Sequence, residues 1–248
     1  MKKLVIKLIF GFIILPASLA GTLFYLNKNG FFNIQRIEVV LENPSAGQEQ
    51  FLKPNVDALE AALAKYKDVS LWNIKLKTVS KEAKEFDWIE SAMISRSWPA
   101  TLSLKVKPYE VKLLYMGKAG KLLPIIKDGS FLAPVEAKQA PDVAILEGDN
   151  FAAKNELRKK AVEVIEEIPA DGKFSRKTIS EIRYDGKEGF WMTMIKSGIQ
   201  VKIGDDQVAL KAARVSKVVD YLENRQFDAR VIDANLSKKV LVRLRKDP

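Results

Sequence analysis

Acidic side chains occur in adjacent pairs that could do acid–base chemistry. Two such pairs are Glu166-Glu167 and Asp205-Asp206. A catalytic pair needs two carboxyl groups that converge on one bond and have shifted pKa values, and adjacency in the sequence supplies neither condition. We therefore expect these carboxylates to be solvated surface groups.

The residue types that most other catalytic sites require are missing. The sequence contains no cysteine and no histidine, which excludes thiol nucleophiles, disulfides, Cys/His zinc sites and histidine-based triads. It also lacks GxSxG, SxxK, GxGxxG and P-loop motifs, so the nucleophiles and phosphate cradles that these motifs form are not indicated. The expectation is a protein without enzymatic activity, cofactor, metal or small-molecule substrate.

The N-terminal segment predicts the compartment. Basic residues outnumber acidic ones by 41 to 31, a formal net charge of +10, which directs attention to anionic partners. An uncharged, mostly apolar run extends from Leu8 to Leu26, with three lysines before it. As a helix it would be about 28 Å long, close to a bilayer core of about 30 Å. The preceding lysines predict a cytoplasmic end at residues 1–3, a transmembrane helix over residues 4–26 and export of the remainder, which argues against a nucleic-acid partner.

A cleaved signal peptide is the alternative interpretation of this segment. Ser18-Leu19-Ala20 places small residues where a signal peptidase cuts, and Pro16 could break the helix before them. The apolar run nevertheless continues for six residues beyond Ala20, where a cleaved signal normally turns polar. We expect a retained single-pass anchor in the inner membrane, with residues 31–248 in the periplasm.

The first part of the exported chain has the periodicity of a small α+β domain. The predicted elements are a strand over 32–42, a helix over 55–66 with Asn55 as N-cap, a second helix capped by Ser80, and strands over 92–97 and from Leu102. Trp98 and Pro99 lie between the last two strands, where the missing proline N–H costs no ladder bond. We expect Trp98 to be buried at this end of the core.

This segment resembles a known domain. After the apolar run and FFNIQRIEV, the sequence WIESAMISRSWPATLSLKV is similar to the POTRA domain of the FtsQ/DivIB family. Trp88 and Ile89 match the residue pair that ends the second helix in the family. The residues that match the hairpin pattern that follows are Ala92, Ile94, Arg96, Trp98, Pro99, Thr101, Leu102, Leu104 and Val106. The resemblance implies a POTRA domain, ordered β-α-α-β-β, over residues 31–112. Lys107 and Glu110 stand where the family has Glu-x-x-Pro.

The second half resembles the C-terminal β-domain of the same family. Its turn segment matches at Lys127–Phe131, and the alternating hairpin segment matches FWMTMIKSGIQVKIG over residues 190–204. The resemblance implies an FtsQ-type β-domain over residues 113–248, a mixed β-sheet with flanking helices, and the fold class of the chain is then α+β. The family's D-x-R-Y sequence is replaced by Asp233-Ala234-Asn235-Leu236.

The resemblance also implies a function. In the FtsQ family a non-enzymatic, single-pass scaffold of the division machinery is recruited to the septum through its POTRA domain. Its β-domain holds FtsB and FtsL, which regulate septal peptidoglycan synthesis. The alternative is a POTRA-type periplasmic chaperone that receives polypeptides for outer-membrane assembly or secretion. A chaperone of this type is expected to contain several POTRA repeats or a barrel of alternating strands of about ten residues each, and the sequence indicates neither.

The last predicted strand is the candidate partner site. KKVLVRLR, over residues 238–245, alternates Val240, Val242 and Leu244 with Leu241, Arg243 and Arg245. This pattern predicts one face on the core, and a terminal element is expected at a sheet edge that can accept an added strand. The resemblance places the capture of FtsB here, and the candidate residues are Leu236, Lys239, Val240, Leu241, Val242 and Arg243. The cations would attract an acidic partner, and proline at Leu241 or Arg243 would block an added strand if those N–H groups face the edge.

Overall fold

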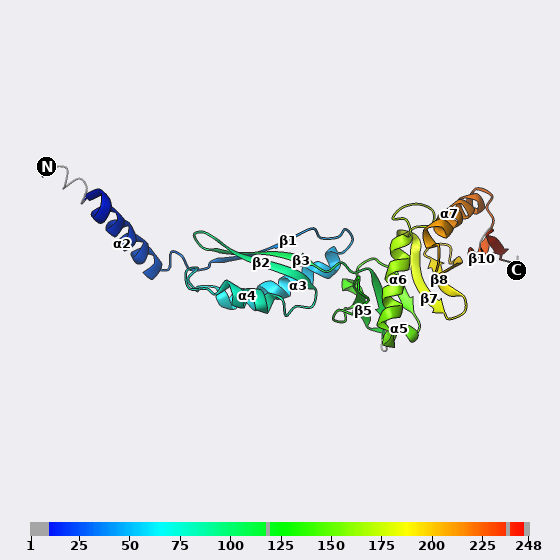
Figure 1. Ribbon diagram of the computed structural model, residues 1–248, viewed down its shortest axis with the longest axis horizontal. Helices are drawn as coiled ribbons and strands as arrows, with labels where there is room; N and C mark the ends of the chain where they lie inside the picture. The colour runs from blue at the N-terminus through cyan, green and yellow to red at the C-terminus, as the bar shows by residue number, and fades with distance from the viewer. Residues whose placement is uncertain (1–9, 118–119, 237–238, 246–248) are drawn as a thin grey trace. The chain divides into compact units, whose positions relative to one another are not determined.

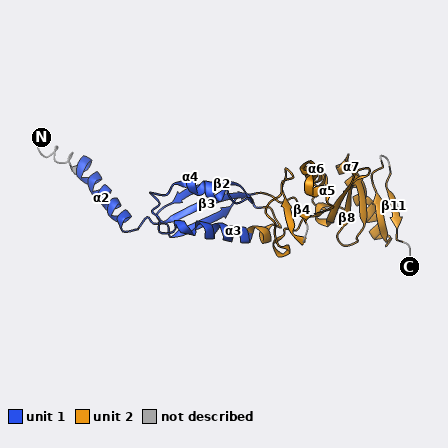
Figure 2. Ribbon diagram, turned by 90° about the horizontal axis from the view of Figure 1, so that it is seen from below, with its two compact units in different colours: residues 1–44, 53–108 blue, residues 45–52, 109–248 orange. Residues whose placement is uncertain are grey.

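The computed structural model describes residues 10–117, 120–236 and 239–245 (Figure 1). The described chain separates into two compact units (Figure 2). The first contains the residues up to Pro44 together with Lys53–Pro108, and the second contains Ser45–Leu52 and the chain from Tyr109 onward.

A helical segment precedes the first sheet. A π-helical turn, η1 (Phe10–Ile14), continues into α2 (Leu15–Lys28). No residue of α2 is buried, and Phe24 is 72% exposed. None of the helices in the described ranges combines the length and apolarity that crossing a membrane requires. The predicted cytoplasmic end at residues 1–3 and residues 4–9 of the predicted transmembrane helix lie outside these ranges.

The first unit contains the predicted order of strand, helix, helix, strand and strand. Its elements are β1 (Arg36–Leu41), α3 (Glu49–Leu63), a 3₁₀ turn (Ala64–Tyr66), α4 (Leu76–Ala83), β2 (Ile89–Ser97) and β3 (Thr101–Pro108). The first turn of α3, up to Leu52, belongs to the second unit. The sheet order is β1-β3-β2, with β1 parallel and β2 antiparallel to β3. Leu102, Leu104 and Val106 on β3 are fully buried, so the alternating pattern specifies the inner face of the central strand.

Both helices of this unit begin earlier than predicted. Because Phe51 and Leu52 are buried, α3 extends to Glu49 and contains Pro54, so Asn55 is not its N-cap. The Gln48 side chain holds this helix start, with its amide bonded to both the N–H and the carbonyl of Val111. α4 begins at Leu76, which places Ser80 inside the helix.

The expected burial of Trp98 is wrong. Its side chain is 48% exposed, although it does lie between β2 and β3. The carbonyl of Val69 accepts the amide of Ile34, and the amide of Leu71 donates to Phe32. This pairing brings the buried side chain of Leu71 across the end of the core. Trp98 consequently packs outside it, against Phe32.

The second unit is built on an eight-stranded mixed sheet. In chain order its strands are β4 (Leu113–Met116), β5 (Leu122–Ile125), β6 (Ile145–Glu147), β7 (Ile179–Asp185), β8 (Gly189–Met194), β9 (Gln200–Gly204), β10 (Ala229–Asp233) and β11 (Leu241–Leu244). Their order in the sheet is β11-β10-β9-β8-β7-β6-β4-β5. Three pairs are parallel, β4 with β6, β6 with β7, and β9 with β10, so the predicted mixed sheet is confirmed.

Helices cover one face of this sheet. They are α5 (Asn150–Ala153), α6 (Asn155–Glu167) and α7 (Val208–Asn224), with 3₁₀ turns at Ala137–Gln139 and Arg176–Thr178. Ile165 of α6 and Val215 of α7 belong to one buried cluster with Val201 of β9 and Ile232 of β10. Apolar residues at helical and strand spacing thus meet in a common core.

Candidate partner-binding edge

β11 lies at the end of the described eight-stranded sheet and has β10 as its strand neighbour. The expected edge position of the last strand is therefore confirmed. We refer to the outer side of Leu241–Leu244 as the β11 edge. Unpaired N–H and C=O groups at a sheet edge can accept another strand.

The direction of the backbone donors follows from one hydrogen bond. The amide of Arg245 donates to the carbonyl of Asp228 at 2.9 Å, toward β10. Because N–H groups point alternately to the two sides of a strand, those of Arg243 and Leu241 also point toward β10. The N–H groups of Val242 and Leu244 point outward. Proline at Leu241 or Arg243 would thus break the pairing with β10, and neither is the edge donor that the prediction required.

The two faces of β11 differ as predicted at most positions. Val240 and Val242 are partly buried against the core cluster, whereas Leu241 and Arg243 are exposed. Leu244 departs from the pattern because it lies at the outer end of the sheet opposite the small Ala229, and it is 50% exposed.

A basic groove adjoins the β11 edge. It has a volume of about 650 Å³ and is lined by Gly198, Gln200, Arg230, Arg243, Leu244 and Arg245. The Arg245 guanidinium donates to the carbonyl of Ser197 at 2.9 Å and lies 3.6 Å from the Asp228 carboxylate. Arg230 and Arg243 are exposed, so this end of the sheet carries positive charge at its surface.

The candidate residues Lys239 and Leu236 lie outside β11. Lys239 is exposed and Leu236 is half-buried. Residues 237 and 238, between them, lie outside the described residues. The candidate set therefore concentrates on β11 itself, with Leu236 and Lys239 on the approach to the strand.

Asn235 is a positioning residue that sequence reasoning missed. Its side-chain oxygen accepts a hydrogen bond from Lys211 at 3.0 Å, and its amide donates to the carbonyl of Glu188 at 3.2 Å. Lys211 is only 3% exposed and also bonds Asp206 at 2.5 Å, which lowers the pKa of the Asp206 carboxyl. This network ties the chain leaving β10 to α7 and to the turn before β8. An asparagine two residues after the end of β10 was the available sequence signal.

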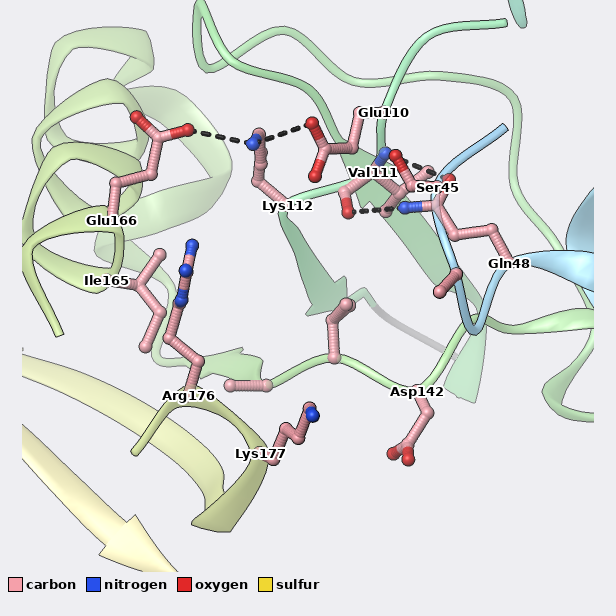
Figure 3. Close-up of a pocket in the computed structure, with 13 residues that line it drawn as sticks. Ser45, Gln48, Glu110, Val111, Lys112, Asp142, Ile165, Glu166, Arg176 and Lys177 are labelled. Carbon is pink, nitrogen blue, oxygen red and sulfur yellow. Dashed lines mark hydrogen bonds and ion pairs between the residues drawn. The ribbon is translucent and has the colours of Figure 1, made fainter. Parts of the chain in front are cut away.

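A pocket near the start of α3 contains Glu166, one member of the first acidic pair (Figure 3). Lys112 lies between two carboxylates, 2.8 Å from Glu110 and 2.8 Å from Glu166. Its hydrogen bond lowers the pKa of Glu166. A general acid at neutral pH needs a raised pKa, so this arrangement makes an ion-pair network. Glu167 instead accepts the amide of Ala209 at 3.3 Å.

The second acidic pair is divided in the same way. Asp205 pairs with Lys160 at 2.6 Å, and Asp206 pairs with Lys211. Each carboxylate thus forms an ion pair with a different lysine, and the two carboxylates do not converge on a common point. Over the part of the chain that the structure describes, no group of three or more Asp or Glu side chains could hold a metal ion.

Comparisons with known proteins agree with the two-unit fold. A model of the FtsQ-type POTRA domain matches residues 47–109, and a model of the C-terminal region of cell division protein FtsQ/DivIB matches residues 114–235. β11 lies beyond the end of the second match.

Two relatives are similar along much of the chain. Cell division protein FtsQ of Syntrophotalea carbinolica is 24% identical over 241 residues, which cover 94% of this chain and 81% of the relative. FtsQ of Geobacter sp. strain M21 is 26% identical over 185 residues, which cover 70% of this chain and 65% of the relative. With both units matched by FtsQ-type models, the chain belongs to the FtsQ/DivIB family of cell division proteins.

Proposed function

We propose that this protein is a non-enzymatic scaffold of the division machinery whose β11 edge takes up a strand of a partner protein. The observation that carries the proposal is the outer position of β11 in the sheet, next to the basic groove. The outward N–H groups of Val242 and Leu244 would bond the added strand, as in other cases of strand addition.

The partner would be FtsB, in complex with FtsL, as expected for the family. Strand addition supplies main-chain hydrogen bonds, while the side chains beside the strand select the sequence that binds. Leu241 offers an exposed apolar contact and Arg243 a cation. A partner strand with acidic residues would complement this edge, and the positive charge would speed its encounter with the scaffold.

The N-terminal segment would anchor the scaffold in the inner membrane. The apolar run of Leu8–Leu26, with lysines before it, supports a single-pass helix with its N-terminus in the cytoplasm. The side chains of α2 are available for lipid, since none of its residues is buried. Both units would then lie in the periplasm at the septum, where the scaffold links recruitment to septal peptidoglycan synthesis.

The chaperone alternative is not favoured. The first unit matches the POTRA domain of FtsQ type, and the second matches the FtsQ/DivIB C-terminal region. Both matches therefore direct the interpretation to cell division.

The test is capture of FtsB by full-length variants in membranes. Leu244→Pro removes an outward N–H without removing a bond to β10, so we expect capture to be lost while the protein stays folded. Leu244→Ala is the matched control, because it shortens the same side chain but keeps the N–H. Undiminished capture by the proline variant, or equal loss in both variants, would contradict strand addition.

The charge of the edge is tested separately. Arg243→Glu should slow association, with a difference that shrinks as salt rises, because exposed charges are screened within about 10 Å at 0.1 M salt. Lys105→Glu, on an exposed position of β3, is the control of equal charge change. Equal association rates for the two variants would show that the charge of the groove does not contribute to partner binding.

A further inference from the structure

Aromatic rings gather at one end of the first unit. Trp72 and Trp98 have ring centroids 4.8 Å apart, and each packs edge-on against Phe32, at 5.8 and 5.5 Å. Phe31 also packs edge-on against Phe32, with ring centroids 5.1 Å apart. Phe32 is buried at 8% exposure, whereas Phe31, Trp72 and Trp98 are 50%, 52% and 48% exposed. We refer to these three exposed side chains as the aromatic platform.

Core packing does not account for the aromatic platform. Single exposed apolar residues are normal, but contiguous exposed apolar side chains mark interaction surfaces. Val69, whose carbonyl accepts the amide of Ile34, is also exposed. Two half-exposed tryptophans in mutual contact leave a large apolar area in water. A lipid or protein surface in contact with these rings would remove that area from water.

The platform is tied to the chain that leaves α2. The Ser70 hydroxyl bonds the side-chain oxygen of Asn27 at 2.8 Å, and the amide of Phe31 donates to the carbonyl of Leu26 at 3.0 Å. Phe31 follows Lys28, the last residue of α2, by three positions, so their Cα atoms are at most about 11 Å apart. Any surface at which α2 ends is therefore within reach of the platform.

We propose that the aromatic platform docks the first unit on the outer surface of the lipid bilayer, beside the point where α2 leaves it. This inference rests on the proposed membrane anchor. Tryptophan is favoured in the headgroup region because its ring is apolar and its N–H remains hydrogen-bonded. Exposed Lys28, Lys67 and Lys75 lie near the platform in the sequence and would complement anionic headgroups. A lipid surface is thus the occupant that fits both the chemistry and the tether.

Docking would restrict how the first unit swings about the short connection after α2. Only Asn29 and Gly30 separate Lys28 from Phe31, and Gly30 has a positive φ of 77°, a conformation that glycine adopts without strain. Contact of the platform with lipid would hold the first unit at the membrane. The unit would then have two membrane attachments, the helix and the platform.

The absence of cysteine makes a single-label experiment possible in the full-length chain. Ser97→Cys, next to Trp98, reports on the platform. Glu42→Cys, just beyond β1, is the matched control because six strand residues place it about 20 Å from the platform end of the sheet. Ser18→Cys in α2 reports on the anchor. Each labelled protein is placed in nanodiscs of phosphatidylethanolamine and phosphatidylglycerol, with spin labels on the headgroups or in the acyl chains.

We expect headgroup spin labels to quench the fluorophore at residue 97 and to leave the one at residue 42 unchanged. Trp72→Ser combined with Trp98→Ser should reduce quenching at residue 97 to the level at residue 42. Met93→Ser, which removes another exposed apolar side chain of the same unit, should have no effect. Thermal melts by circular dichroism show which variants stay folded, and Phe31→Ser is the second platform variant if the double change unfolds.

The outcomes separate the platform from the anchor. Quenching at residue 18 by acyl-chain labels without quenching at residue 97 overturns the docking and leaves the anchor in place. Quenching at neither residue overturns both. A spectral shift at residue 97 that grows with the protein-to-lipid ratio, without lipid quenching, would assign the platform to a second copy of the chain and overturn the lipid assignment.

Discussion

Asn235→Ala should destabilise the second unit by breaking the network around Lys211. The change removes the hydrogen bond from the buried Lys211 ammonium and the bond to the carbonyl of Glu188. A hydrogen bond to a charged group contributes about 1.5–3 kcal/mol and a neutral one about 0.5–1.5 kcal/mol. Because Lys211 keeps Asp206 as a partner, we expect a loss of about 2–3 kcal/mol in the free energy of unfolding.

The assay is urea unfolding of the full-length protein in detergent, followed by tryptophan fluorescence. A loss of this size should also lower the melting temperature by about 4–12 °C. Asn224→Ala is the matched control, because Asn224 makes a long, exposed 3.4 Å bond to Asp220 near the end of α7. If both alanine variants lose the same stability, Asn235 does not hold the chain after β10 in the way that we argue.

Three further outcomes are expected. Trp98→Ala should cost less than half the roughly 3–5 kcal/mol of Trp88→Ala, because Trp88 is 1% exposed; equal urea midpoints would show that Trp98 is part of the core. Gly204→Ala should be destabilising because Gly204 has a φ of 76° and a Cβ there meets the Asn235 side chain. Its cost should fall in the Asn235→Ala background, and strict additivity in a double-mutant cycle would argue against the clash. Ion pairs lower the folded-state pKa of Glu166 and Asp206. Their stabilisation is therefore present above the ordinary carboxyl pKa of about 4 and is lost as pH falls through the folded-state values. Acid titration of Lys112→Met should show a smaller loss of stability than the wild type, and identical titrations would contradict this.

The periodicity of apolar residues correctly predicted those elements whose pattern allows only one face to be buried. The alternation of Leu102, Leu104 and Val106 places one face of β3 in the core, and the spacing of Val208, Val215 and Leu222 defines the buried side of α7. Helix starts were less predictable. Pro54 suggests a boundary, but the burial of Phe51 and Leu52 extends α3 past it, and that burial depends on residues distant in the chain.

The position of the candidate site was partly predictable. A terminal strand with Val240 and Val242 on one side predicts an edge with one buried face. The direction of its N–H groups was not predictable, because it is set by the register against β10 and by the bond from Arg245 to Asp228. Alternation in a sequence is the same for either direction of the hydrogen bonds.

By itself the sequence determined the family resemblance, the α+β class, and the lack of cysteine and histidine chemistry, since these depend only on residue types and local spacing. The tertiary structure decided which polar residues cooperate and which aromatics stay exposed. Asn235 meets Lys211 across 24 positions, and Trp98 meets Trp72 across a sheet end. Such contacts depend on how distant segments pack, because a local pattern specifies which face of an element is apolar but not which other element covers that face.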